Sequence, residues 1–517
     1  MNTSDRSQDQ ARPVPPPFLN RADPYDFGES LFGHSAQAIE RFLDQKGGLE
    51  HVSEASLAAQ IRRYIYNHES RARYVAAATN YLRHKRPCLR TVYDVILVGA
   101  GIHAAAFLYT LRKEHPNLHV LVVEKSEAIC FTFSKMGDSL VLNSPTYSKI
   151  GLNSNIVEGH FIQVSDFDEV VEKPFPTAKH LHELATMMLF HADADILFNF
   201  EVCGVERSET TYTVSSATQA ITARSVVLSN GMGETKTNTF DRDRVTEHTM
   251  YGDDFIASFY RDQAFPDSIR DKRVAVIGGG DTANCVMEYL LPLVYPNYKY
   301  GFQREGPFLP RFVYWIGQRA QNVQEFGLTN KHRYCHSGGL VEFFWNGETP
   351  FDLPAETWRE TKALIKCIPD KLVSLSHQVN AIELVTSHER LEVDLVIDCT
   401  GRANRLSSTL LKNEYDFVGG DIVFYGGHWD VDLDQFVVSP LRRPGRRIAC
   451  HIKDERIFLL GSACPLSELI GDEEAKDGAL KYQEHRTSFT NSKWSLEHTL
   501  PRSVSFAKMF ADAYLRG

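Results

Sequence analysis

The sequence has no uninterrupted apolar run of about 18 residues, the length that a membrane-spanning helix needs, so we expect no membrane anchor. It also lacks the apolar core of a signal peptide near its start, and its nine cysteines include no C-x-x-C pair. Scattered cysteines of this kind indicate a reducing compartment and argue against structural zinc or disulfides. These absences together predict a cytoplasmic protein without a metal site.

Positive charge is also in short supply. The chain has 56 Lys and Arg residues against 66 Asp and Glu, which gives a formal net charge of −10. Such a balance argues against nucleic acid or an anionic membrane surface as the main partner. No G-x-S-x-G or H-E-x-x-H motif occurs, so nothing predicts a serine nucleophile or a zinc hydrolase.

The length of 517 residues is too great for a single core, so we expect about two or three domains. Residues 1–25 are polar and rich in proline, which predicts a disordered or extended arm. Residues 35–84 have apolar side chains at helical spacing. This pattern favours a helical extension packed on the main body, with a surface for a partner or a second copy of the chain as the alternative.

Two glycine-rich turns dominate the rest of the chain. Each follows a run of β-branched residues and precedes a segment with helical spacing: Gly99-x-Gly101-x-x-Ala104 in the first copy, Gly278-x-Gly280-x-x-Ala283 in the second. A strand, a glycine turn and a helix start present free backbone N–H groups to the pyrophosphate of a dinucleotide. Two copies in one chain predict a relay between a mobile nicotinamide and a resident flavin.

The first unit is predicted as a strand at 93–98, a helix at 102–114 and a strand at 119–124. Glu124 ends the second strand, where an acid in dinucleotide-binding folds accepts hydrogen bonds from the adenosine ribose and repels a 2′-phosphate. The site therefore suits FAD or NAD better than NADP. The alternative is a surface carboxylate that merely ends a strand.

The second unit is predicted as a strand at 273–277, a helix at 282–294 and a strand at 298–303, followed by Arg304. A guanidinium at the place of the acid suits the 2′-phosphate of NADPH, although an exposed charge at a strand end remains the alternative. The contrast between Glu124 and Arg304 assigns FAD to the first site and NADPH to the second.

Three further strands are predicted to end near the cofactors, before Asn230-Gly231, at Thr400-Gly401 and at Gly461. They lead to an α/β fold with two Rossmann-like dinucleotide-binding domains and an N-terminal helical extension, in which the NADPH domain is inserted into a split FAD domain. The predicted boundaries are 1–90 for the arm and extension, 91–240 and 391–517 for the two FAD halves, and 241–390 for the NADPH domain with an inserted substrate-region segment.

On these motifs, residues 91–470 resemble the two-dinucleotide-binding-domain flavoproteins, and within them the flavin-containing monooxygenases and ornithine/lysine N-hydroxylases. Leu140-Val-Leu-Asn-Ser-Pro145 and Ser165-Asp166-Phe167 look like segments of the flavin-containing monooxygenases. The resemblance implies that Asn143 lies beside the flavin ring as the catalytic residue, with a turn-capping asparagine as the alternative. The residues expected to contact FAD or NADPH are Gly99, Gly101, Ala104, Glu124, Lys125, Asn143, Gly231, Gly278, Gly280, Asp281, Thr282, Ala283, Arg304, Thr400, Gly401, Gly461 and Ser462.

The implied reaction passes hydride from NADPH to the flavin, whose C4a-hydroperoxide then oxygenates a nitrogen or sulfur nucleophile of a small molecule. The expected partners are this substrate and O₂, and the oligomeric state stays open. Two alternatives remain: an NAD(P)H-dependent flavin reductase or oxidase without substrate oxygenation, and a non-catalytic relative that keeps the flavin.

Overall fold

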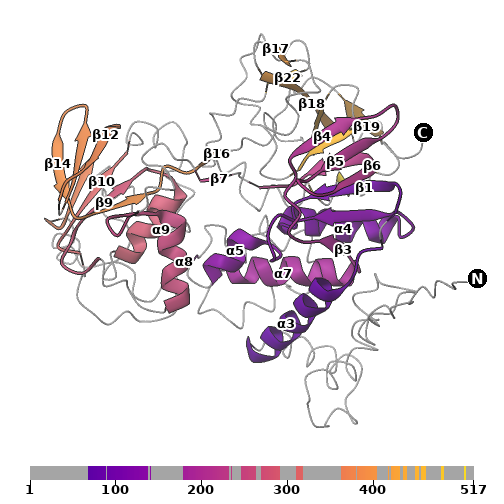
Figure 1. Ribbon diagram of the computed structural model, residues 1–517, viewed down its shortest axis with the longest axis horizontal. Helices are drawn as coiled ribbons and strands as arrows, with labels where there is room; N and C mark the ends of the chain where they lie inside the picture. The colour runs from indigo at the N-terminus through magenta and orange to yellow at the C-terminus, as the bar shows by residue number, and fades with distance from the viewer. Residues whose placement is uncertain are drawn as a thin grey trace, which may run out of the picture.

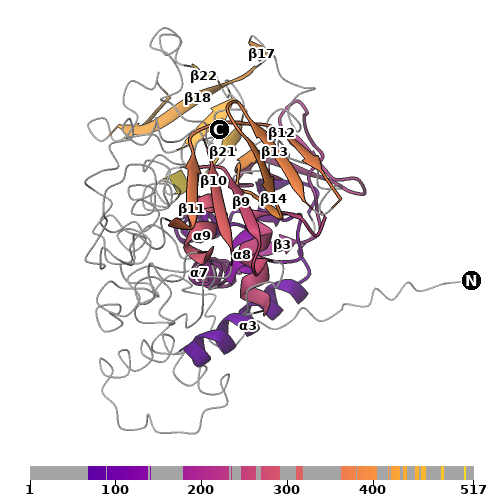
Figure 2. The same ribbon diagram turned by 90° about the vertical axis from the view of Figure 1, so that its left-hand side faces the viewer.

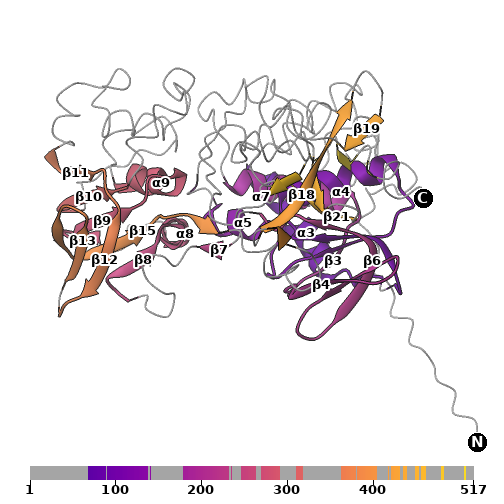
Figure 3. The same ribbon diagram turned by 90° about the horizontal axis from the view of Figure 1, so that it is seen from above.

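The computed structural model of the protein contains two large sheets, which lie side by side in Figure 1 and again, seen from above, in Figure 3. The described residues are 68–88, 90–137, 140, 178–231, 234–235, 246–262, 269–290, 310–317, 363–379, 381–403, 417–418, 421–430, 435–438, 449–452, 456–460, 479–481, 503, 506–507 and 510. Among these residues, no helix is long and apolar enough to cross a bilayer.

Among the described residues, the core of the first sheet consists of five parallel strands in the order β21-β6-β1-β2-β3. Their bounds are β1 Tyr93–Val98, β2 Val120–Val123, β3 Asp195–Leu197, β6 Ala220–Leu228 and β21 Ile457–Leu459. Because β21 comes from the C-terminal part of the chain and pairs with β6, the first domain is split in sequence, as predicted.

Alternation along β1 sends its side chains to two different layers. Val95 and Leu97 pack against helices α4 (Ile102–Glu114) and α7 (Ala178–His191). Ile96 and Val98 face the opposite layer, which contains the hairpin of β4 (Gly204–Arg207) and β5 (Tyr212–Ser215). Both faces of the parallel strands are therefore covered, which explains why β1 and β2 are almost entirely apolar.

Helix α3, His68–His84, is the described part of the N-terminal extension. Its residues Val75, Ala78 and Leu82 are buried in the core that α4 and α7 form. Just beyond its end, Lys85 Nζ lies 2.8 Å from Asp193 Oδ1 and 3.0 Å from an oxygen of Asp195. These contacts attach the extension to the main body.

The C-terminal chain returns to the same domain. Phe506 and Phe510 pack with Phe107 of α4 and Phe458 of β21, with ring centroids 5.3–5.4 Å apart. Beyond β21, the sheet continues through antiparallel strands, of which the long β18 crosses the upper part of Figure 2. These strands are β17 Phe417–Val418, β18 Asp421–Asp430, β19 Gln435–Val438, β20 Ala449–Ile452 and β22 Ala479–Lys481.

In the part of the chain that the structure describes, the second sheet has five parallel strands in the order β11-β10-β9-β15-β8. They span β8 Thr249–Tyr251, β9 Arg273–Ile277, β10 Phe312–Ile316, β11 Ile365–Ile368 and β15 Leu395–Asp398. Helices α8 (Gly252–Asp262) and α9 (Asp281–Leu290) cover one face. The other face packs on a three-stranded antiparallel meander, formed by β12 (Leu372–His377), β13 (Ile382–Thr386) and β14 (Arg390–Val393).

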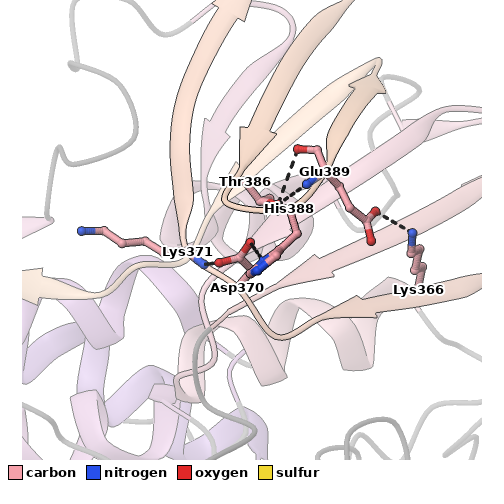
Figure 4. A network of polar contacts seen from close by, with 6 residues as sticks. All are labelled: Lys366, Asp370, Lys371, Thr386, His388 and Glu389. Carbon is pink, nitrogen blue, oxygen red and sulfur yellow. Dashed lines mark hydrogen bonds and ion pairs between the residues drawn. The ribbon is translucent and has the colours of Figure 1, made fainter.

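The meander is tied to the end of β11 by a polar network (Figure 4). His388, in the turn between β13 and β14, contacts Asp370 at 3.0 Å, and Lys366 pairs with Glu389. Desolvation alone would raise the pKa of Asp370, but hydrogen bonds from His388, the Lys371 amide, and nearby hydroxyls together hold it below its usual range. The turn is therefore fixed beside the carboxyl end of β11.

One predicted domain boundary is wrong. The segment that begins at residue 391 was assigned to the second half of the first domain, but β15 lies between β9 and β8 in the second sheet. The chain leaves the second domain only after β15, where β16 (Arg402–Ala403) pairs with β7 (Glu234–Thr235). This two-stranded ladder joins the two segments that run between the domains.

Between the domains, the short helix α5 (Phe131–Met136) lies next to both α7 and α8. Met136 is buried in the core of the second domain, and Lys135 forms an ion pair with Asp254 of α8. Phe133 packs against the cores of both domains. The end of the first glycine-turn unit is thus in direct contact with the second domain.

Candidate functional site

The two glycine turns lie at the carboxyl ends of β1 and β9 and share one backbone arrangement. The Gly99 amide donates to the Val123 carbonyl at 2.8 Å, and the Gly278 amide donates to the Ile316 carbonyl at 2.7 Å. On the other side of each turn, the neighbouring strand donates to the residue before the glycine. The Ser229 amide donates to the Val98 carbonyl at 2.8 Å, and the Cys399 amide donates to the Ile277 carbonyl at 2.7 Å. Each turn is thus held between the ends of its two neighbouring strands, where ligands of open α/β sheets bind.

The first glycine of each turn is required by close packing. A Cβ atom on Gly99 would lie 2.7 Å from the Ser229 carbonyl oxygen, and one on Gly278 would lie 2.3 Å from the Cys399 carbonyl oxygen. Both residues also have positive φ angles, +100° and +122°. Any larger residue would therefore clash and be strained at either position.

The second glycine of each turn is different because its side-chain position is open. A Cβ on Gly280 would have no described heavy atom within 4 Å, and one on Gly101 would only reach Ser229 O at 3.9 Å. None of the described residues requires glycine at these two positions, whereas a ligand that approaches the backbone does. Gly101 is the N-cap of α4 and gives no side-chain cap, and the N-terminus of a helix is a place where anions bind.

Each turn is adjacent to a buried polar atom that has no hydrogen-bond partner within the described residues. These atoms are Asn230 Oδ1, next to the first turn, and Thr400 Oγ1, next to the second. Unsatisfied buried polar atoms are costly, and a bound polar ligand is one way to satisfy them. Gly231 and Gly401 follow these two residues, both with an open side-chain position. Open glycines and unsatisfied polar atoms at both turns fit a dinucleotide.

Glu124 distinguishes the first turn. Its Oε2 accepts a hydrogen bond from the Ala100 amide at 2.8 Å, and its Oε1 accepts from the Ser126 amide and hydroxyl at 2.9 and 2.8 Å. The carboxylate is buried, whereas the neighbouring Lys125 is exposed. These contacts fix the carboxylate beside the turn, at the end of the second strand of the unit.

The corresponding place in the second unit is held by Gly317. It follows β10, the strand that pairs with β9 in the same register as β2 pairs with β1. A Cβ on Gly317 would lie 3.1–3.3 Å from backbone atoms of Gly278 and Gly279, so no side chain fits easily there. Trp315 of β10 braces the turn instead, with its indole N–H donating to the Gly278 carbonyl at 2.8 Å.

The pairing of β10 with β9 contradicts the spacing argument by which Arg304 was predicted to contact NADPH. The predicted second strand, 298–303, and Arg304 itself lie outside the described residues. The strand next to β9 is β10, which begins at Phe312, so the position after the second strand belongs to Gly317. The spacing of the first unit does not apply, because the connection from α9 to β10 is longer than the one from α4 to β2.

Two buried cysteines lie near the turns, and neither is suited to thiol chemistry. The Cys130 amide donates to the Ala100 carbonyl at 3.0 Å, and burial raises the pKa of its thiol to about 12. Burial likewise raises the pKa of Cys399 well above its usual value. Both thiols therefore stay protonated near neutral pH and are poor nucleophiles. The described residues also contain no cluster of side chains that would hold a metal ion.

The predicted site residues fall into three groups. Gly99, Gly101, Ala104 and Glu124 gather at the first turn, with Gly231 following Asn230. Gly278, Gly280, Thr282, Ala283, Thr400 and Gly401 gather at the second turn and the start of α9. Asn143, Arg304, Gly461, Ser462 and the side chain of Asp281 lie outside the described residues.

Sequence reasoning missed three residues that contact or border the turns. Asn230 was noted only as the neighbour of Gly231, and Ser126 and Trp315 were not considered. A serine two residues after the acid is a local signal that could have been read. Trp315 had no such signal, because its role depends on β10 being the neighbour of β9.

The sequence matches no protein-family model and no curated protein sequence. Similar solved structures include the ornithine N-hydroxylase of Kutzneria sp. 744 with reduced FAD, NADP⁺ and L-ornithine, at 14% identity and a TM-score of 0.46. Others are the bacillithiol disulfide reductase of Staphylococcus aureus, at 10% and 0.46, and the thioredoxin reductase of T. acidophilum, at 12% and 0.42. Each alignment covers 82% of this chain and 99% of the other. These values assign neither a ligand nor a reaction to this chain.

Proposed function

We propose that this chain, whose two linked sheets have the architecture of the two-dinucleotide-binding-domain flavoproteins, is an FAD- and NADPH-dependent monooxygenase. The observation that carries the proposal is the pair of matched turns, each open to a ligand at its second glycine, Gly101 or Gly280. A chain with two such turns is suited to a relay in which a visiting nicotinamide dinucleotide reduces a resident flavin.

The first turn is assigned to FAD because of Glu124. Its carboxylate is held in one orientation by Ala100 and Ser126, and Oε2, which accepts one hydrogen bond, keeps capacity for another. A carboxylate at the end of the second strand accepts hydrogen bonds from ribose hydroxyls and repels a 2′-phosphate. FAD carries no phosphate at this ribose position, so it fits the site where NADPH does not.

The second turn is assigned to NADPH because the repelling carboxylate is missing there. Gly317 occupies its place, and the tight packing against Gly278 and Gly279 disfavours any side chain. The turn is braced by Trp315, whose indole N–H donates to the Gly278 carbonyl. Thr400 Oγ1 adds a buried polar atom beside the same turn.

When bound, FAD and NADPH supply hydride transfer and the activation of O₂. The chain's own residues would hold the two pyrophosphates at the turns, orient the flavin's ribose through Glu124, and keep Cys130 and Cys399 out of the chemistry as protonated thiols. Oxygen transfer to a nitrogen or sulfur nucleophile is supported by the resemblance of segment 140–145. Asn143 is the residue proposed to hydrogen-bond the reacting edge of the flavin. The proposed reaction is N-hydroxylation of a small molecule in a biosynthetic pathway.

The test follows the fate of oxygen during NADPH oxidation. Protein loaded with FAD is supplied with NADPH and O₂, with and without a panel of small amines and thioethers, and hydrogen peroxide is measured in each case. A monooxygenase shows a substrate that lowers the peroxide yield and gains one labelled oxygen atom from isotopically labelled O₂. Recovery of all consumed oxygen as peroxide with every compound would instead indicate a flavin reductase or oxidase.

A further inference from the structure

The carboxyl end of β11 lies one strand beyond the place that Gly317 occupies. Because the strands run in the order β11-β10-β9, the second glycine turn, Gly317 and the end of β11 are neighbours along one edge of the sheet. A Cβ on Gly317 would lie 3.1 Å from the Gly278 carbonyl carbon, and the Gly317 amide donates to the Ile368 carbonyl at 3.1 Å. Neighbouring strands are about 4.8 Å apart, so the end of β11 is about two such spacings from the turn.

The loop after β11 is fixed to this edge by hydrogen bonds. The Ile368 carbonyl, which accepts from the Gly317 amide, also accepts from the Asp370 amide at 2.8 Å. Asp370 Oδ1 in turn accepts from the Lys371 amide at 2.7 Å. One carbonyl oxygen therefore links Gly317 to the loop that carries Lys371, and Lys371 is held at the same edge of the sheet as the second glycine turn.

Lys371 brings a positive charge to this edge. In the described loops that follow β9, β10 and β11 (residues 278–280, 317 and 369–371), it is the only basic residue, and it is exposed. Arg273 and Lys366 of the same sheet form ion pairs with Asp394 and Glu389. The Lys371 ammonium has no such partner within the described residues. Its charge is therefore available to a ligand at the carboxyl edge.

Asp370, the acid next to Lys371, is engaged in the network of Figure 4. Its Oδ1 accepts from the Lys371 amide, and its Oδ2 contacts His388 at 3.0 Å. Only 12% of the Asp370 side chain is exposed. Figure 4 shows the Lys371 side chain extended away from the other five residues of the network. The carboxylate is thus used to hold the loop, whereas the ammonium projects from it.

We propose that Lys371 binds the 2′-phosphate of NADPH, so that the third strand of the unit, and not the second, selects between the two nicotinamide dinucleotides. In dinucleotide-binding folds, an acid or an arginine near the end of the second strand makes this choice. Gly317 leaves that position without a side chain, and Lys371 follows the strand next to it. An ammonium on a flexible four-carbon stem is suited to bind a phosphate as a point charge. The inference rests on the proposed function, since it takes the second turn as the NADPH site.

Titration calorimetry of the full chain with NADP⁺ and NAD⁺ tests the inference, because these two molecules differ only in the 2′-phosphate. The parent protein should bind NADP⁺ more tightly. Lys371→Gln should weaken NADP⁺ binding by about tenfold, the loss of one charge-assisted hydrogen bond, and leave NAD⁺ binding unchanged. Lys371→Arg should keep the preference for NADP⁺. Arg311→Gln removes an exposed cation at the opposite end of β10, so this matched control should change neither affinity.

The possible failures of this test can be told apart. Thermal unfolding and FAD content are measured on the same samples, so that a misfolded variant is recognised. A folded Lys371→Gln protein that keeps the full preference for NADP⁺ would overturn the role of Lys371 and leave the proposed function intact. Equal weakening of NADP⁺ and NAD⁺ binding would also overturn it, because Lys371 would then not distinguish the 2′-phosphate. A parent protein that binds neither dinucleotide would overturn the proposed function itself, and this inference with it.

Discussion

Replacement of the second glycine of each turn by alanine should affect binding of the dinucleotide but not folding of the chain. At Gly280 an added Cβ would have no described heavy atom within 4 Å, and at Gly101 its nearest neighbour would be an ordinary contact at 3.9 Å. Gly280→Ala and Gly101→Ala should therefore fold normally. The added methyl group would instead occupy space that a pyrophosphate needs when it approaches the backbone.

The magnitude follows from the hydrogen bonds that the methyl group prevents. A hydrogen bond to a charged group contributes about 1.5–3 kcal/mol, so loss of one backbone N–H contact to phosphate should weaken binding by about 10- to 150-fold. Gly280→Ala should raise the dissociation constant for NADP⁺ by this factor and leave the FAD content unchanged. Gly101→Ala should lower FAD retention instead.

The assay combines titration calorimetry with NADP⁺, flavin absorbance after gel filtration, and thermal unfolding. Gly278→Ala is the contrasting variant, because its Cβ would lie 2.3 Å from Cys399 O and the whole second domain should be destabilised. Two results from a folded Gly280→Ala protein would refute the assignment of the two turns. One is a dissociation constant for NADP⁺ equal to that of the parent, and the other is loss of FAD instead of weaker NADP⁺ binding.

Three further predictions concern single side chains. Trp315→Phe removes the N–H that braces Gly278, so it should lower stability by about 1–3 kcal/mol and weaken NADP⁺ binding without loss of FAD, and loss of FAD alone would contradict the role given to Trp315. Burial lowers the pKa of His103 to about 4, so between about pH 7 and about pH 5 this histidine is protonated in the unfolded chain but stays neutral in the folded chain. The free energy of unfolding should therefore fall by about 2 kcal/mol over this pH range. The free energy of unfolding of His103→Asn, measured by urea unfolding at each pH, should lack this decrease. A variant with the same pH dependence as the parent protein would contradict the role given to His103. Arg304→Ala should leave the preference for NADPH over NADH unchanged if the strand register sets it, whereas loss of the preference in steady-state kinetics would restore Arg304 as the partner of the 2′-phosphate.

Local patterns were sufficient to predict the first unit. The predicted strand 93–98 and helix 102–114 have the bounds of β1 and α4, because a fully buried parallel strand, a glycine turn and a helix start are each specified by adjacent residues. The split of the first domain was also predicted correctly, and β21 beside β6 confirms it. Glu124 was correctly placed at the end of the second strand for the same local reason.

What could not be predicted depends on pairing between distant segments. The strand β15 ends before Cys399-Thr400-Gly401 much as β6 ends before Ser229-Asn230-Gly231, because both pass a glycine turn at close range. The ending therefore does not reveal which sheet the strand joins, and β15 was assigned to the wrong domain. The same limit applies to β10, since nothing local shows that it pairs with β9.

The most direct test of the central claim, that one chain holds both a flavin and a nicotinamide dinucleotide close enough for hydride transfer, is an anaerobic titration. The protein is purified, supplied with FAD, freed of excess cofactor, and mixed with stoichiometric NADPH without oxygen while the flavin absorbance is recorded. We predict that the oxidised flavin spectrum is lost as NADPH is consumed. A protein that retains no FAD, or a bound flavin that neither NADPH nor NADH reduces, would contradict the account.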